Sequence, residues 1–223
     1  MPTGGDLNRL FSDPPLLHTW DEGQTWNTGG FSGPDLRWLA DLCGAYPAAA
    51  VAETGAGCST LAFLWATTGP VVTIAPDAEL RGRIEAAASE YGVSLSSWTF
   101  LDERSELALP RLADGGHRVD VALIDGGHGW PTPFVDFCYL NRMLGNGGTL
   151  ILDDLQLHSV GELARLLVHQ WGWERVSDAP SQKTISLRKV SDEPFLPDWG
   201  GQPYIVERSS GQKTGYENYG LGS

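Results

Sequence analysis

The chain contains few cysteines, few basic residues and no long apolar run. Its three cysteines, Cys43, Cys58 and Cys138, are odd in number, and their spacing matches no zinc-binding pattern. We therefore expect reduced thiols, as in a cytoplasm. Only 15 lysines and arginines stand against 28 aspartates and glutamates, which gives a formal net charge of -13. This acidic balance argues against binding to the phosphates of a nucleic acid.

Signals for membranes and repeats are also missing. No apolar stretch approaches the length of a membrane span, and the first residues show no basic region followed by an apolar run. There is no internal repeat and no hydrophobic heptad pattern. Hydrophobic residues make up 41% of the 223 residues, which suffices for a sizeable core in one domain. The sequence thus predicts a soluble, cytoplasmic protein that binds neither membranes nor nucleic acid.

Short apolar runs alternate with helical patterns along the middle of the chain. The apolar runs predict strands at 50–52, 71–74, 95–101, 119–125 and 149–152. Apolar spacing predicts a helix starting near Pro34 and others at 59–67, 78–91, 105–112, 134–144 and 159–170. Pro110 is expected to break the helix at 105–112, and Gly145–Gly148 to close the one at 134–144.

Two further strands, 173–176 and 184–190, are expected to pair around a turn at 179–181. Five successive alternations of strand and helix predict an α/β protein with a Rossmann-like, doubly wound sheet. This sheet would have five parallel strands plus the closing strand pair, with helices on both faces.

The two ends of the chain differ from this middle. Residues 1–33 are rich in Gly, Pro, Asp and Trp, and Trp20, Trp26 and Phe31 indicate a cap or lid segment that packs on the domain or over a pocket. Residues 191–223 are rich in Pro, Gly and Tyr and are expected to form an extension, partly mobile. The main domain is therefore predicted to cover residues 34–190.

Residues 51–61 join the first strand to the first helix through a glycine-rich turn. Gly55 and Gly57 would let a ligand lie against the main chain at the start of a helix. Glu53 would face that ligand, where an anion suits hydroxyls or a cationic group. Thr60 occupies the place of the third glycine in the dinucleotide fingerprint, which disfavours a nicotinamide dehydrogenase. A turn that binds nothing is the plain structural alternative.

Acidic residues follow the fourth and fifth predicted strands. Asp125 opens the segment Asp125-Gly126-Gly127-His128, and the pair Asp153-Asp154 follows the next strand. The carboxyl ends of parallel strands meet at one edge of the sheet, so these carboxylates would repel one another unless a cation lies between them. Oxygen ligands favour Mg²⁺, with Mn²⁺ or Ca²⁺ as alternatives. Capping of the following helices is the structural alternative.

The E-x-G-x-G turn followed by Ser59-Thr60 resembles motif I of the class I S-adenosylmethionine-dependent methyltransferases. The Asp-x-x-His segment and the later acidic pair are similar to the macrocin O-methyltransferase and cephalosporin-hydroxylase-like branch, over about residues 35 to 190. The resemblance implies a divalent ion, commonly Mg²⁺, on Asp125, Asp153 and Asp154. It implies cofactor contacts from Glu53, Gly55, Ala56, Gly57, Ser59 and Asp125.

One position departs from the family. Members usually end strand two with an acidic residue that binds the ribose hydroxyls, and Ala75 stands there in this chain. We expect Asp77 to take over that role. Asp102, after strand three, would lie where the family contacts the adenine amino group.

The implied reaction is transfer of a methyl group from S-adenosylmethionine to a hydroxyl of a small-molecule acceptor, assisted by Mg²⁺ or another divalent cation. Asp125 would hold that ion, and His128 would act as general base or, alternatively, orient Asp125. His158 is the second candidate base, and Trp130 could flank a flat acceptor. Three other histidines have no motif context and are expected on the surface: His18, His117 and His169.

A non-catalytic Rossmann-like module that binds a nucleoside or a protein partner is the alternative function, and Ala75 is the residue that favours it. The sequence leaves open a homo-oligomer and does not name the acceptor.

Overall fold

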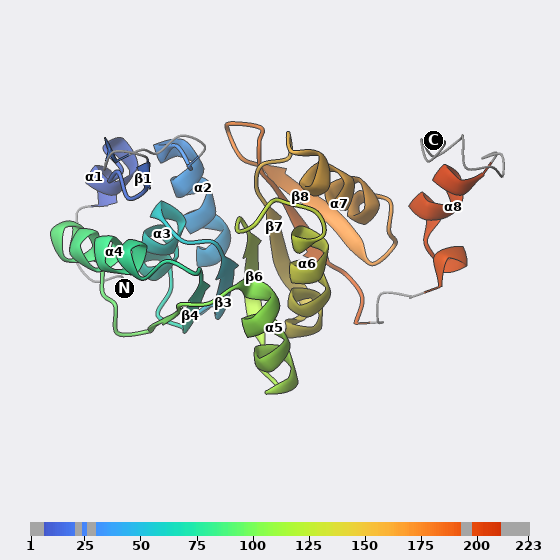
Figure 1. Ribbon diagram of the computed structural model, residues 1–223, viewed down its shortest axis with the longest axis horizontal. Helices are drawn as coiled ribbons and strands as arrows, with labels where there is room; N and C mark the ends of the chain where they lie inside the picture. The colour runs from blue at the N-terminus through green and yellow to red at the C-terminus, as the bar shows by residue number, and fades with distance from the viewer. Residues whose placement is uncertain (1–6, 21–23, 26–29, 193–197, 211–223) are drawn as a thin grey trace, which may run out of the picture.

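The computed structural model describes residues 7–20, 24–25, 30–192 and 198–210 (Figure 1). Seven strands form one sheet in the order β5-β4-β3-β6-β7-β9-β8. Five of them are parallel: β3 (Val51–Thr54), β4 (Val71–Ile74), β5 (Trp98–Leu101), β6 (Val119–Ile124) and β7 (Leu144–Leu152). Strands β9 (Ile185–Lys189) and β8 (Trp173–Asp178) close the edge as an antiparallel pair. The predicted doubly wound sheet with its closing strand pair is confirmed.

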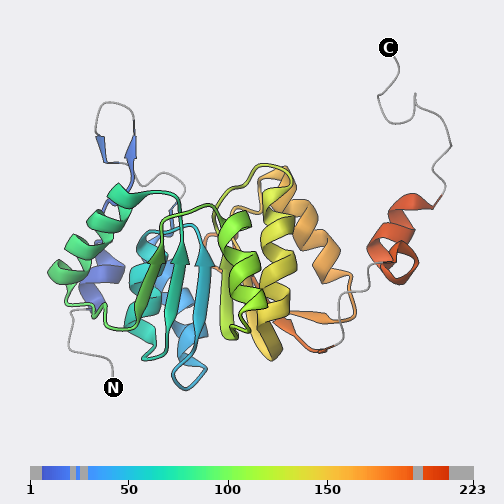
Figure 2. The ribbon, with the colours of Figure 1, turned by 60° about the horizontal axis from the view of Figure 1, so that its bottom comes forward.

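Helices cover both faces of this sheet (Figures 1 and 2). One face carries α2 (Gly33–Gly44), α3 (Cys58–Ala66) and α4 (Ala78–Tyr91). The other face carries α5 (Ser105–Asp114), α6 (Thr132–Met143) and α7 (His158–Val168). Predicted and observed boundaries of α4 and β4 coincide, because both elements carry uninterrupted propensity and α4 ends at Gly92 in the left-handed conformation.

Two apolar clusters form the core, one on each face of the sheet. Successive strand residues alternate between them: Val51 and Leu123 join the cluster under α2–α4, while Ala52 and Ile124 join the cluster under α5–α7. This alternation follows from the two-residue period of a strand. The same period turns Glu53 toward α3 and Thr54 toward α6.

The N-terminal segment is more ordered than its sequence indicates. A short helix, α1 (Leu7–Ser12), packs on α2 and α4, and Leu10, Phe11 and Leu17 are buried in the same core cluster as Leu61. A two-stranded ribbon follows, β1 (Thr19–Trp20) with β2 (Gln24–Thr25), and stands out above α4 in Figure 2. The expectation for Trp26 lies outside the described residues.

Three sequence-based expectations are wrong. Helix α5 continues through Pro110 to Asp114, because the loss of one hydrogen bond is outweighed by burial of Ala108, Leu109 and Ala113. Gly145–Gly148 belongs to strand β7, which begins at Leu144 beside Val119 and pairs irregularly there. The apolar spacing of Leu163, Leu166 and Leu167 extends to Trp171 in the sequence and predicts Trp171 on the same helix, but this residue lies beyond α7 and is exposed.

The C-terminal part contains a helix that the Pro- and Gly-rich sequence does not predict. Residues Trp199–Gly201 form a short turn, η2, and α8 (Pro203–Ser209) follows at the end of the molecule opposite to α1 (Figure 1). Tyr204 donates a hydrogen bond to Glu162 of α7 and its ring lies 5.5 Å from that of His169. The expectation of mobility for residues 211–223 falls outside the described residues. Among the described helices, none is long and apolar enough to cross a bilayer.

Two glycine substitutions test how the N-terminal segment is held. A Cβ at Gly33 would lie 1.7 Å from the carbonyl oxygen of Phe11, whereas a Cβ at Gly82 in α4 meets nothing within 4 Å. We expect Gly33→Ala to lower the unfolding free energy by more than about 2 kcal/mol. Gly82→Ala should raise it by roughly 0.5–1 kcal/mol through helix propensity. Urea denaturation measures both, and equal effects would contradict the close packing at Gly33.

Candidate functional site

The loops after β3 and β6 meet at the point where the strand order reverses. Gly55 has φ +87°, and a Cβ there would lie 2.2 Å from the carbonyl oxygen of Asp125. A Cβ at Gly126 would in turn lie 3.1 Å from the Gly55 nitrogen. Glycine is therefore required at position 55 for its backbone angle and for this close approach. Ligands of open α/β sheets bind outside the carboxyl ends of the strands at such a point.

A cavity of about 650 Å³ opens at this crossing. It contains several predicted site residues, namely Gly55, Ala56, Asp77, Asp125 and Asp154. The loop after β5 adds Arg104, Ser105 and Glu106, which the sequence did not single out; their place at the start of α5 was the available signal. Asp102 is exposed and does not line the cavity.

The predicted ligand-facing Glu53 instead lies under the glycine turn. Its side chain is fully buried, and its carboxylate accepts hydrogen bonds from Ser59 Oγ (2.8 Å), Thr60 Oγ1 (2.5 Å) and Thr73 Oγ1 (2.8 Å). Thr60 Oγ1 also accepts the main-chain N–H of Gly57 at 3.1 Å. Glu53 thus joins β3, α3 and β4 directly beneath the cavity floor.

Burial raises the pKa of Glu53 to about 7, and the hydrogen bonds from Thr60, Thr73 and Ser59 oppose this rise. The carboxyl group is therefore partly protonated near neutral pH. A hydroxyl can accept as well as donate, so these three partners suit both protonation states.

Acidic and histidine side chains gather at the β6 and β7 ends of the cavity. Single ligand atoms of Asp125, His128 and Asp154 lie within 4.8 Å of one another. His128 Nε2 lies 3.7 Å from Asp125 Oδ1, and His128 Nδ1 lies 3.5 Å from Asp154 Oδ2. Nε2 is buried and has no hydrogen-bond partner. Burial, followed by the charges of Asp153 and Asp154, raises the pKa of Asp125 well above its usual range.

The two residues after β7 have different surroundings. Asp153 is buried behind the cluster, where Thr184 Oγ1 donates a hydrogen bond to it, and burial raises its pKa. Asp154 turns into the cavity with φ +60°, a left-handed conformation that Asp tolerates better than most residues. Its Oδ1 accepts Gln156 Nε2 at 2.7 Å, while Oδ2 faces His128. The structure thus groups Asp125 and Asp154 with His128, and places Asp153 in support.

The second candidate base lies apart from this cluster. His158 is exposed on the first turn of α7, outside the group that contains His128. His117 and His169 are exposed as expected. The expectation for His18 is wrong, because this residue lines the cavity beside the glycine turn. No sequence motif marks it, since it comes from the irregular N-terminal segment.

A buried carboxyl lies on the α5–α6 side of the cavity floor. Asp136 of α6 is fully buried, and burial raises its pKa to about 6. The hydroxyls of Ser105 and Thr54 approach it and oppose that rise, but no partner of Asp136 meets hydrogen-bond geometry. Glu53 and Asp136 therefore place one buried acid on each face of β3.

The loop that follows His128 carries an exposed aromatic. Trp130 is 72% exposed, and its ring centroid lies 4.7 Å from that of Phe134. Such a ring can pack against a flat molecule that enters the cavity from solvent.

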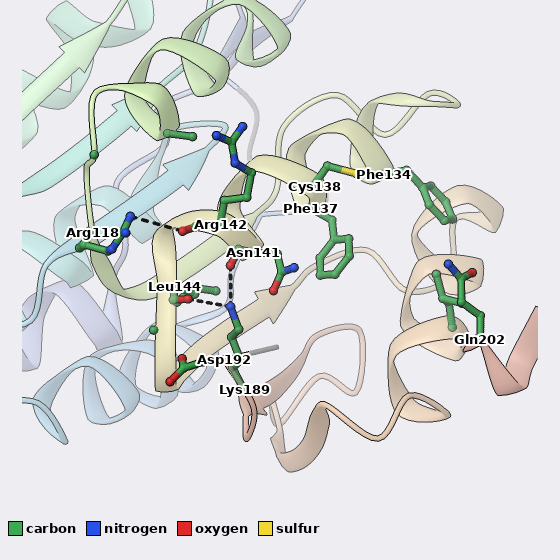
Figure 3. Close-up of a pocket in the computed structure, with 14 residues that line it drawn as sticks. Arg118, Phe134, Phe137, Cys138, Asn141, Arg142, Leu144, Lys189, Asp192 and Gln202 are labelled. Atoms are coloured by element: carbon green, nitrogen blue, oxygen red, sulfur yellow. Dashed lines mark hydrogen bonds between the residues drawn. The ribbon is translucent and has the colours of Figure 1, made fainter. Parts of the chain in front are cut away.

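A larger cavity of about 920 Å³ lies at the opposite edge of the sheet, near the starts of β6 and β7 (Figure 3). Two of its cationic side chains already have partners in the chain. Lys189 Nζ donates to the carbonyl oxygens of Asn141 (2.7 Å) and Leu144 (2.8 Å), and Arg142 pairs with Asp114 at 2.8 Å. None of the rim carboxylates lines this cavity. The functional site is therefore assigned to the smaller cavity.

Comparison with known proteins supports the fold assignment. No family model matches the chain, and no curated sequence does. Among solved structures, cofactor-bound Rv0187 from MTB has a TM-score of 0.62 at 17% identity over 74% of this chain and 83% of that one. This chain has the fold of the class I methyltransferases.

Two further solved structures show the same fold. The O-methyltransferase TomG from Streptomyces achromogenes, involved in tomaymycin synthesis and in complex with SAM, has a TM-score of 0.61 at 17% identity over 84% of this chain and 87% of its own. The SAH-bound methyltransferase PaMTH1 from Podospora anserina has a TM-score of 0.58 at 14% identity over 74% and 81%.

The buried Glu53 predicts a specific dependence of stability on pH. Its pKa rises from 4.5 to about 7 on folding, so the unfolding free energy falls as pH rises through this window. The loss reaches about 3 kcal/mol by pH 7.5. Glu53→Gln removes this loss, so its stability relative to the natural chain should rise by that amount between pH 4.5 and 7.5. Urea denaturation at both pH values measures it.

Glu79→Gln is the matched control, because the side chain of Glu79 is 86% exposed. The difference in unfolding free energy between Glu79→Gln and the natural chain should be the same at both pH values. If the difference in unfolding free energy between Glu53→Gln and the natural chain were also the same at both pH values, the pKa of Glu53 would not be raised on folding.

Proposed function

We propose that the protein is an S-adenosylmethionine-dependent methyltransferase that methylates a hydroxyl of a small-molecule acceptor with the help of a divalent cation. The observation that carries this proposal is the cavity at the crossing of β3 and β6, with the Gly55–Gly57 turn on one side and the acidic cluster on the other. The likeness to SAM- and SAH-bound structures supports it through the fold.

The residues around the cavity fit such a cofactor. The main chain at Gly55 and Ala56 is open to a ligand, and the adjacent acidic cluster suits the positive sulfonium and amino groups of S-adenosylmethionine. When bound, that cofactor supplies an electrophilic methyl group. Glu53, below the turn, acts through Ser59 and Thr60 to hold the turn in place and has no direct contact with the cavity.

The acidic cluster also fits a divalent cation. Asp125 and Asp154 would hold the ion. Burial, followed by the charges of Asp153 and Asp154, raises the pKa of Asp125, and a cation would relieve the repulsion among these carboxylates. When bound, the ion lowers the pKa of a coordinated hydroxyl. His128, whose Nε2 has no partner, is the group we assign to accept the proton of the acceptor hydroxyl. Trp130 would lie against the acceptor.

Within the methyltransferases, the protein would belong to the macrocin O-methyltransferase and cephalosporin-hydroxylase-like branch. The segment from Asp125 to His128 and the pair Asp153-Asp154 support this placement. Residues 7–18 and 30–33 would serve as a cap, consistent with His18 and Gly30 at the cavity edge.

Cofactor binding is tested by calorimetric titration with S-adenosylhomocysteine. We expect 1:1 binding in the micromolar range to the natural chain. Gly55→Ala should abolish it, because the new Cβ would lie 2.2 Å from the Asp125 carbonyl oxygen. Gly129→Ala is the control, since its Cβ would meet nothing within 4 Å. Absence of binding to the natural chain at millimolar ligand would overturn the proposed function.

The cation is tested by thermal unfolding at pH 7 in chelated buffer and with millimolar Mg²⁺ or Mn²⁺. The midpoint temperature of unfolding of the natural chain should rise by several degrees when the ion is added, because ligands that bind only the folded state stabilise it. Asp125→Asn should be more stable than the natural chain without ion and gain nothing with it, because one repelling carboxylate is gone. Asp102→Asn is the exposed control and should respond like the natural chain. An unchanged response in Asp125→Asn would exclude Asp125 as a ligand.

A further inference from the structure

Residues 7–18, here called the N-terminal strap, are fixed to α3 and α4. Tyr91 Oη of α4 donates a hydrogen bond to the carbonyl oxygen of Asp13 at 2.7 Å. Cys58 Sγ, at the first residue of α3, lies 3.2 Å from the carbonyl oxygen of Pro15. With Leu10 and Leu17 buried in the core, the strap is held along its whole length and ends at the glycine turn.

The last residue of the strap, His18, lies against that turn. Its Nε2 is 3.1 Å from the position that a Cβ on Gly57 would occupy, and the side chain lines the same cavity as Ala75 and Asp77. Burial and then the charge of Arg83 lower the pKa of His18, while Asp77 and a hydrogen bond to the main chain of Ala56 oppose this. The imidazole is therefore neutral at neutral pH.

A neutral imidazole has one donor nitrogen and one acceptor nitrogen. A hydrogen bond to the main chain of Ala56 uses the donor nitrogen, so the other ring nitrogen of this cavity-lining side chain is an acceptor. An acceptor nitrogen binds hydroxyl groups and repels carboxylates.

The end of β4 offers one other polar side chain to this part of the cavity. Ala75 contributes only a methyl group and Pro76 has no N–H, whereas Asp77 is partly exposed. Asp77 Oδ1 caps α4 by accepting Leu80 N at 2.8 Å, and Oδ2 lies 3.8 Å from Arg83. The charge of Asp77 acts on the imidazole, and both side chains line the same cavity. An imidazole nitrogen and a carboxylate oxygen are both hydrogen-bond acceptors, which match the two O–H donors of a vicinal diol.

We propose that His18 and Asp77 together bind the ribose hydroxyls of the cofactor, so that the N-terminal strap forms part of the cofactor site. This inference rests on the proposed function and names the residues that replace an acidic side chain at position 75. His18 is then a specificity-determining residue for nucleosides that carry both hydroxyls.

The experiment compares four ligands by calorimetry: S-adenosylhomocysteine, 5′-methylthioadenosine, which lacks the amino-acid part, 2′,3′-dideoxyadenosine, and adenosine as the reference for the dideoxy compound. The variants are His18→Ala, His18→Gln, which keeps an acceptor, and Asp77→Asn, which keeps a helix cap. His117→Ala is the control, because His117 is exposed and bonds Leu112 of its own loop.

We expect His18→Ala to lower the affinity for S-adenosylhomocysteine and for 5′-methylthioadenosine by about tenfold each, because one hydrogen bond is lost. His18→Gln should recover part of that affinity. Asp77→Asn should lower the affinity for both ligands, and His117→Ala should leave both affinities unchanged. The preference for adenosine over 2′,3′-dideoxyadenosine should fall in His18→Ala by the same factor.

Three results would overturn the proposal. A His18→Ala penalty seen with S-adenosylhomocysteine but not with 5′-methylthioadenosine would place His18 at the amino-acid part. Unchanged affinity in His18→Ala, with binding by the natural chain intact, would remove His18 from the site while leaving the methyltransferase proposal standing. Failure of the natural chain to bind any of these ligands would overturn the proposed function itself.

Discussion

The close approach of two main-chain segments, after β3 and after β6, is the constraint on which the site depends. Gly55 lies so near the Asp125 carbonyl that a single methyl group cannot fit between them. This contact brings the glycine turn and the acidic cluster to one cavity, although they are 70 residues apart in the chain. A looser crossing would separate the glycine turn from the acidic cluster.

Support for this crossing comes from buried acids that do not line the cavity. Glu53 binds hydroxyls from α3 and β4, while Asp136 lies on the other face of β3 near Thr54. Buried carboxyls cost free energy unless they are hydrogen-bonded or protonated, and both of these have raised pKa values. The hydrogen bonds of Glu53 to Ser59, Thr60 and Thr73 tie β3, α3 and β4 together.

Much of the sheet could be predicted from the sequence, because apolar runs such as Val71–Ile74 are buried on both faces and leave a strong local signal. The rim position of Asp125 and Asp154 follows from the rule that parallel strands end at one edge. The direction of Glu53 could not be predicted without the register, because one residue more or less along β3 exchanges the two faces.

The residues that could not be predicted from the sequence lie mostly outside regular patterns. His18 lies in a segment without apolar periodicity, and its position is set by tertiary contacts at Pro15 and Asp13 that no local signal reports. Pro110 was expected to end a helix, yet burial on either side of it decides the outcome. Local propensity predicts the structure at these residues poorly, because packing against distant elements outweighs it.

The attachment of residues 7–18 across α3 and α4 has a thermodynamic consequence. If a ligand touches His18, then docking of this segment and occupancy of the cavity share one free energy of coupling, and each must strengthen the other by the same factor. Changes at Tyr91 or Cys58, neither of which lines the cavity, would then alter the occupancy of the cavity at a given ligand concentration.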